Sequence, residues 1–131
     1  MSDPSATPPS PAPGTVGWFD LTVPDAAPVR DFYQAVAGWT AGEIDMGGYA
    51  DYAMQAPGGE TVAGICHARG SNAAFPAQWL IYITVPDVDA AAARCTDLGG
   101  QVLVGPKSMG QARYCVIQDP AGAVAGLWQP G

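Results

Sequence analysis

A segment of this chain occurs twice. Thr22-Val23-Pro24-Asp25 recurs as Thr84-Val85-Pro86-Asp87, an interval of 62 residues (84 − 22 = 62). Ungapped agreement at one interval across separated stretches indicates an internal duplication. We therefore expect two copies of one unit, at about 15–69 and 77–131. Further residues align at this interval: Gly38 with Gly100, Tyr52 with Tyr114, and Val62-Ala63-Gly64 with Val124-Ala125-Gly126.

Each unit predicts the element order βαβββ. An apolar strand opens each one, at 18–23 and 79–85, and a Pro-Asp pair follows. Asp25 and Asp87 stand where an N-cap carboxylate accepts the free N–H groups of a helix. Gly38 is expected to end the first helix, and Gly99-Gly100 the second. Three strands then complete each unit.

The first helix has an apolar pattern of its own. Val29, Phe32 and Val36 recur at spacings of three and four residues. This spacing places them on one face of a helix, so we expect that face to be buried.

Composition limits the classes of function. The chain of 131 residues carries 12 acidic and 5 basic side chains, a net charge of −7. Because this charge repels phosphate backbones and anionic lipid, we expect neither nucleic-acid nor membrane binding. The cysteines are odd in number and form no Cys-x-x-Cys pair, which favours free thiols in a reducing cytoplasm. They are Cys66, Cys95 and Cys115. Residues 1–14 contain five prolines and no cation, which predicts a disordered arm ahead of the domain at 15–131.

In this duplicated order, the motifs resemble the vicinal oxygen chelate superfamily, which includes glyoxalase I, bleomycin-resistance proteins and extradiol dioxygenases. The resemblance covers about 15–130 and implies an α+β fold. Two βαβββ modules would form a half-open cup of mixed sheet, with helices on its convex side. The motifs are the strand followed by Pro-Asp, Phe32-Tyr33 with Gly38-Trp39, Leu98-Gly99-Gly100, and Asp119-Pro120-Ala121-Gly122.

The resemblance also implies where a metal would bind. Enzymes of that superfamily hold a divalent ion with side chains from the first and last strands of both units. By position these ligands fall on Trp18, Gly64, Leu80 and Gly126. None of these residues offers a side-chain lone pair to a metal, so we predict no metal and no other cofactor. His67, the only histidine, is out of phase with Gly64 and is expected to be a hydrogen-bonded boundary residue.

Strand alternation predicts what lines the cup. Asp20 and Tyr82, which are equivalent in the repeat, are the polar groups of an otherwise apolar and aromatic wall, while Phe19 and Ile81 point beneath the helices. Two alternatives remain: the tryptophans fill the cup as a closed core, or Asp20 reaches solvent or pairs with Arg113. The predicted lining is Trp18, Asp20, Gly64, Cys66, Leu80, Tyr82, Gly126 and Trp128.

Such a lining favours a metal-free protein that binds a small hydrophobic or aromatic molecule, similar to the drug-sequestering branch of the superfamily. The alternative is a metal-independent isomerase, cyclase or lyase, with Asp20 as acid or base and Tyr82 as hydrogen-bond donor. A weaker alternative is a metal-dependent enzyme with unusual ligands. Trp39 and Trp79 are expected in boundary packing or a dimer contact, and we expect a homodimer.

Overall fold

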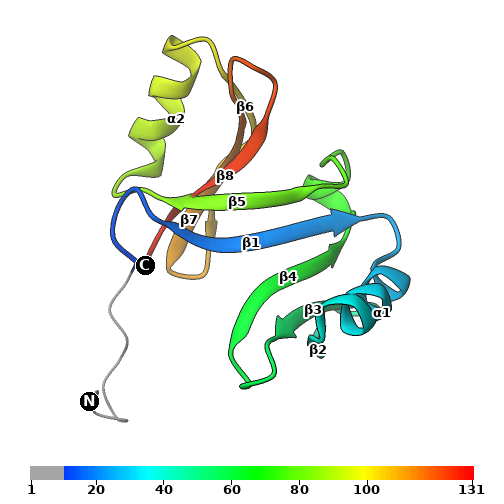
Figure 1. Ribbon diagram of the computed structural model, residues 1–131. Coiled ribbons are helices and arrows are strands. Elements are labelled where there is room, and N and C mark those ends of the chain that lie inside the picture. Colours follow the sequence, from blue (N-terminus) through cyan, green and yellow to red (C-terminus); the bar gives the residue numbers. More distant parts are fainter. Residues whose placement is uncertain (1–10) are drawn as a thin grey trace, which may run out of the picture.

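A computed structural model describes residues 11–131 and contains the predicted element order twice (Figure 1). Module one comprises β1 (Val16–Val23), α1 (Ala26–Ala37), β2 (Thr40–Asp45), β3 (Ala50–Gln55) and β4 (Thr61–His67). A short 3-10 turn, η1 (Gly70–Asn72), leads to module two. That module comprises β5 (Trp79–Thr84), α2 (Val88–Asp97), β6 (Gln101–Met109), β7 (Ala112–Gln118) and β8 (Val124–Gln129).

All eight strands form one mixed sheet in the order β2-β3-β4-β1-β5-β8-β7-β6. The opening strands β1 and β5 lie antiparallel at its centre and join the two modules, as Figure 1 shows. Within each module the opening strand pairs in parallel with the last one, β1 with β4 and β5 with β8. The α+β fold of two βαβββ modules is therefore confirmed.

The helix ends follow the sequence signals in three places out of four. Gly38 ends α1 in the left-handed region at φ 73°, and Gly99 follows α2 at φ 93°. Asp87 caps α2 by accepting the Ala90 N–H at 3.1 Å. Asp25 occupies the N-cap position of α1 as expected, but its side chain makes no cap hydrogen bond, so that part of the expectation is wrong.

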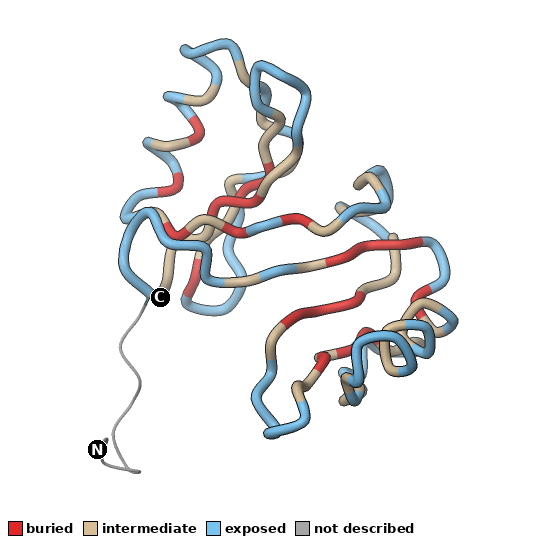
Figure 2. Tube along the Cα trace, viewed as in Figure 1, coloured by how far each residue is buried: buried red, intermediate tan, exposed pale blue. Residues whose placement is uncertain are grey.

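Each module has its own core between its helix and the sheet. Buried residues in Figure 2 follow the central strands and the inner turns of α2. The prediction of a buried Val29–Phe32–Val36 face is wrong for two of its members: Phe32 is 55% and Val36 67% exposed. Val29 and Tyr33 contact the core instead. The first core contains Leu21, Val23, Ala26, Tyr52, Met54 and Ile65, and the second Val88, Ala92, Cys115 and Leu127.

Phe19 and Ile81 lie opposite each other where β1 meets β5, on the face of the sheet that carries the helices. They are 44% and 37% exposed, so the expectation that they pack beneath the helices is wrong. Phe19 borders a shallow apolar hollow with Trp39, Val62, Ala63 and Trp79. We call Phe19, Trp39, Val62, Trp79 and Ile81 the convex patch.

The first described residues, 11–14, depart from the predicted arm. They form a turn whose Gly14 N–H donates to the Thr84 carbonyl at 2.7 Å. The rest of the predicted arm, 1–10, lies outside the described residues. Neither helix of the described chain combines the length and the hydropathy that crossing a membrane requires.

Candidate functional site

The face of the sheet opposite the helices carries a cavity of about 550 Å³. That volume is in the range of small-molecule sites, roughly 300–1,000 Å³. Trp18 and Trp128 lie in its walls and leave it open, so the closed-core alternative is wrong. Six aromatic side chains surround the cavity: Trp18, Tyr49, Phe75, Tyr82, Tyr114 and Trp128.

The structure brings together most of the predicted lining. Trp18, Asp20, Cys66, Tyr82 and Trp128 all border the cavity. They come from four strands, β1, β4, β5 and β8, which are adjacent in the sheet. The alternation of side chains along β1 and β5 therefore predicted the floor of the cavity correctly.

Leu80, Gly64 and Gly126 do not border the cavity. Leu80 is fully buried. Gly64 lies beside Asp20 across the β1–β4 pair, and the Asp20 carboxylate occupies the space that a Cβ at Gly64 would need. The Tyr82 ring fills the corresponding space over Gly126. The two glycines thus make room for the chain's own polar side chains and not for a ligand.

Asp20 is a largely buried acid on the cavity floor. Trp18 Nε1–H donates to its Oδ1 at 3.2 Å, and the Cys66 thiol approaches both carboxylate oxygens at 3.7 and 3.8 Å. Burial raises the pKa of Asp20, and these hydrogen bonds only partly oppose that effect. Arg113 is not its partner, since Arg113 donates to both oxygens of Asp89 at 2.8 and 3.1 Å.

Tyr82 and Cys66 remain neutral beside Asp20. Burial, and then the negative charge of Asp20, raises the pKa of both side chains far above neutral pH. The phenol and the thiol therefore keep their protons and act as donors. A thiol in this state is a poor nucleophile, because the reactive form is the thiolate.

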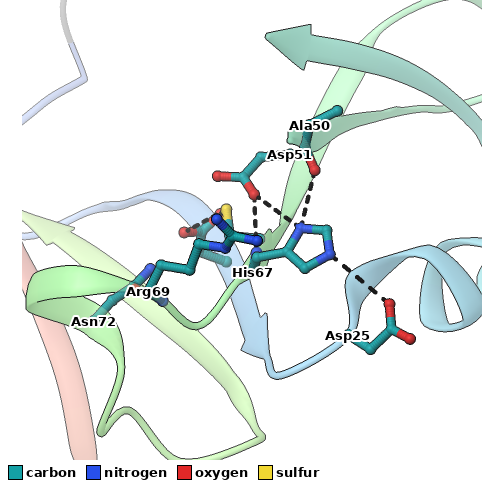
Figure 3. A network of polar contacts seen from close by, with 8 residues as sticks. Asp25, Ala50, Asp51, His67, Arg69 and Asn72 are labelled. Carbon is teal, nitrogen blue, oxygen red and sulfur yellow. Dashed lines mark hydrogen bonds and ion pairs between the residues drawn. The ribbon is translucent and has the colours of Figure 1, made fainter. Parts of the chain in front are cut away.

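Sequence reasoning missed the polar side of the cavity, which centres on Asp51 and His67 (Figure 3). Asp51 is buried, and its Oδ1 accepts the backbone N–H of His67 at 2.8 Å. His67 Nδ1–H donates to the Ala50 carbonyl at 3.0 Å, and Nε2 lies 3.8 Å from Asp25 Oδ1. His67 is a hydrogen-bonded boundary residue as predicted, but it also borders the cavity.

Arg69 stands beside this group, as Figure 3 shows, and lies over the Tyr49 ring at 3.9 Å from the ring centre. Its backbone N–H donates to Asn72 Oδ1 at 2.7 Å. One signal for this side was present: an acid, Asp51, within an otherwise apolar strand. The segments around Tyr49 and Asn72 have no periodicity that would predict their approach to the floor.

The side chains present do not fit a divalent metal. Within residues 11–131, no group of three or more His, Cys, Asp or Glu side chains converges as metal ligands would. The positions that correspond to the superfamily's ligands hold an indole, a leucine and two glycines. The Asp20 carboxylate, which lies beside Gly64, is instead engaged by Trp18 and Cys66.

Two curated relatives are similar over most of this chain. The anthracycline biosynthesis protein DnrV of Streptomyces peucetius is 33% identical over 133 residues, which span 92% of this chain and 48% of the relative. A protein of Mycobacterium bovis, provisionally named glyoxylase CFP32, is 38% identical over 119 residues, 88% of this chain and 46% of the relative. The chain thus spans about half the length of the curated relatives it matches.

Among solved structures, a methylmalonyl-CoA epimerase of Streptomyces coelicolor matches with a TM-score of 0.57 and 18% identity, over 92% of this chain and 99% of the epimerase. At that identity the likeness shows the fold alone. The sequence profile of the Glyoxalase/Bleomycin resistance protein/Dioxygenase superfamily matches residues 15–125. Together with the duplicated βαβββ sheet, this match shows that the chain belongs to that superfamily.

Proposed function

We propose that this chain binds a small, flat, mainly aromatic molecule in its cavity, without a metal ion. The observation that carries the proposal is the open cavity of about 550 Å³ with aromatic walls and a few polar groups on its floor. Aromatic walls supply contact area for a flat ligand, and the polar groups fix its orientation. The name of DnrV, an anthracycline biosynthesis protein, supports a ligand with fused rings.

Tryptophan fluorescence tests this proposal. Trp18 and Trp128 border the cavity, whereas Trp39 and Trp79 belong to the convex patch. Titration with an anthracycline, daunorubicin, should quench the emission and raise the Tm, because a ligand that binds only the folded state stabilises it. Trp128→Phe should lose part of the quenching, while Trp39→Phe, the control, keeps it.

Metal dependence is the second half of that test. Binding should be the same after extensive dialysis against EDTA and after addition of Mn²⁺, Ni²⁺ or Zn²⁺. Failure of daunorubicin and of a panel of smaller flat aromatics to change either signal would overturn the binding proposal. Binding that appears only with added metal would overturn the metal-free part.

The buried carboxyl of Asp20 favours a second candidate, a metal-independent isomerase, cyclase or lyase. Its raised pKa suits a group that exchanges a proton with a bound molecule. The neutral Tyr82 phenol would donate a hydrogen bond to an oxygen of that molecule. Asp20→Asn separates the two functions. In both cases the variant keeps its affinity for the ligand, but only an enzyme shows turnover of the bound molecule that collapses in the variant.

We also propose a cytoplasmic homodimer. The convex patch exposes large apolar side chains where β1 and β5 meet, and a second copy of the chain would remove them from water. The curated relatives are about twice as long, which is the length of two such domains. Cys66, Cys95 and Cys115 are free thiols, which supports a reducing compartment.

A further inference from the structure

Thr84 carries a buried hydroxyl that has no hydrogen-bond partner among the described residues. The residue is 2% exposed. Its backbone is satisfied, since its N–H donates to the Thr15 carbonyl at 2.8 Å and its carbonyl accepts from Gly14. Only the side-chain Oγ1 is left without a partner.

The residue that carries this hydroxyl belongs to the cavity wall. Thr84 borders the cavity and lies beside Trp128 across the parallel β5–β8 pair. On its other side is Gly17, where a Cβ would lie 3.1 Å from Oγ1, so the glycine leaves the hydroxyl uncrowded. Trp128 stacks on Tyr114, with ring centres 6.3 Å apart and planes at 27°. An aromatic surface therefore stands next to the hydroxyl.

A buried polar group nearly always has a partner in a native protein, and a group that lacks one carries a desolvation penalty. A threonine hydroxyl both donates and accepts, so it pairs with a phenol, an alcohol or a carbonyl. We propose that Thr84 moves to another staggered rotamer when a ligand binds and so turns its hydroxyl from the buried position into the cavity. There it anchors an oxygen substituent of the aromatic ligand, so that the cavity selects hydroxyl- or carbonyl-bearing aromatics over plain hydrocarbons. This inference rests on the proposed function and names the ligand class more narrowly.

A matched pair of probes tests it: 2-naphthol, which carries the oxygen, and naphthalene, which does not. Calorimetric titration of the full chain should give about 5- to 10-fold tighter binding of 2-naphthol, the worth of one net hydrogen bond. In Thr84→Val this preference should disappear while naphthalene affinity stays. Thr84→Ser, which keeps the hydroxyl, should retain the preference, and so should Thr40→Val, an exposed control on β2.

The outcomes separate the two proposals. If both probes bind and Thr84→Val keeps the full preference for 2-naphthol, the Thr84 inference is wrong and the proposed function stands. If neither probe binds the unchanged chain, both are overturned for this ligand class. The Tm of the ligand-free Thr84→Val variant provides a second readout. It should not fall, because valine removes an unpaired hydroxyl without opening a void; a clear fall would also contradict the inference.

Discussion

The carboxylate of Asp20 lies over the α-carbon of Gly64, in space that the side chain of any other residue would need. The two residues are partners in the parallel β1–β4 pair. Tyr82 and Gly126 repeat this relationship on β5 and β8, at the equivalent positions of the second unit. Both copies of the unit thus pair a polar side chain with a glycine that leaves room for it. The side chain is an aspartate in the first copy and a tyrosine in the second.

Adding a methyl group at either glycine should therefore destabilise the protein. For Gly64→Ala and Gly126→Ala we expect losses of about 1–3 kcal/mol in the free energy of unfolding, the usual cost of overpacking. Gly58→Ala is the control, because a Cβ there would contact nothing and the backbone is compatible with alanine. Urea denaturation measures all three. Removing Asp20 as well, in Gly64→Ala/Asp20→Ala, should recover much of the loss; strictly additive losses would contradict this contact.

Asp20 should make the stability depend on pH. Its pKa is raised in the folded state above the ordinary value of 3.8, so the unfolded chain releases this proton first as pH rises. Stability therefore falls as the pH rises from about 4, and it levels off at the lower value once the pH exceeds the pKa of Asp20 in the folded state. Asp20→Asn should be more stable than the unchanged chain at pH 7, and the gain should shrink toward pH 4. Denaturation at pH 4, 5.5 and 7 tests this, with the exposed Asp97→Asn as comparison; a gain that grows toward low pH would refute it.

Replacing the buried acid Asp51 should destabilise the fold. Its side chain is buried and accepts the His67 N–H, so Asp51→Ala leaves a backbone donor without its partner. We expect a loss of about 1–3 kcal/mol in unfolding free energy. The exposed Glu60→Ala supplies the control and should change stability by no more than about 0.5 kcal/mol. Equal effects of the two substitutions would show that the Asp51 contact contributes little.

The convex patch should decide the oligomeric state. Phe19→Glu places a charge in the centre of that patch, where burial against a second copy would leave it unpaired. Sedimentation velocity should show a dimer for the unchanged chain and a monomer for the variant, with the same circular dichroism spectrum. Phe32→Glu, on the exposed side of α1, is the comparison. A monomeric unchanged chain at micromolar concentration would contradict the homodimer.

Much of the fold and part of the site could be predicted from local patterns. The repeat predicted the element order, and alternation along β1 and β5 predicted that Trp18, Asp20 and Tyr82 share one face. These features depend on residues a few positions apart, whose relative directions the backbone geometry determines. The Gly38 and Asp87 signals are local for the same reason.

The remaining features depend on contacts between segments far apart in the chain. The apolar spacing of α1 was real, but the helix turns Val29 and Tyr33 toward the core and leaves Phe32 and Val36 exposed. No local pattern relates Asp51 on β3 to His67 on β4 or places the Thr84 hydroxyl between Gly17 and Trp128. The sequence by itself determined which side chains alternate and where helices end. Only the tertiary structure decided which of them meet, because strand register and packing follow from burial summed over the whole sheet.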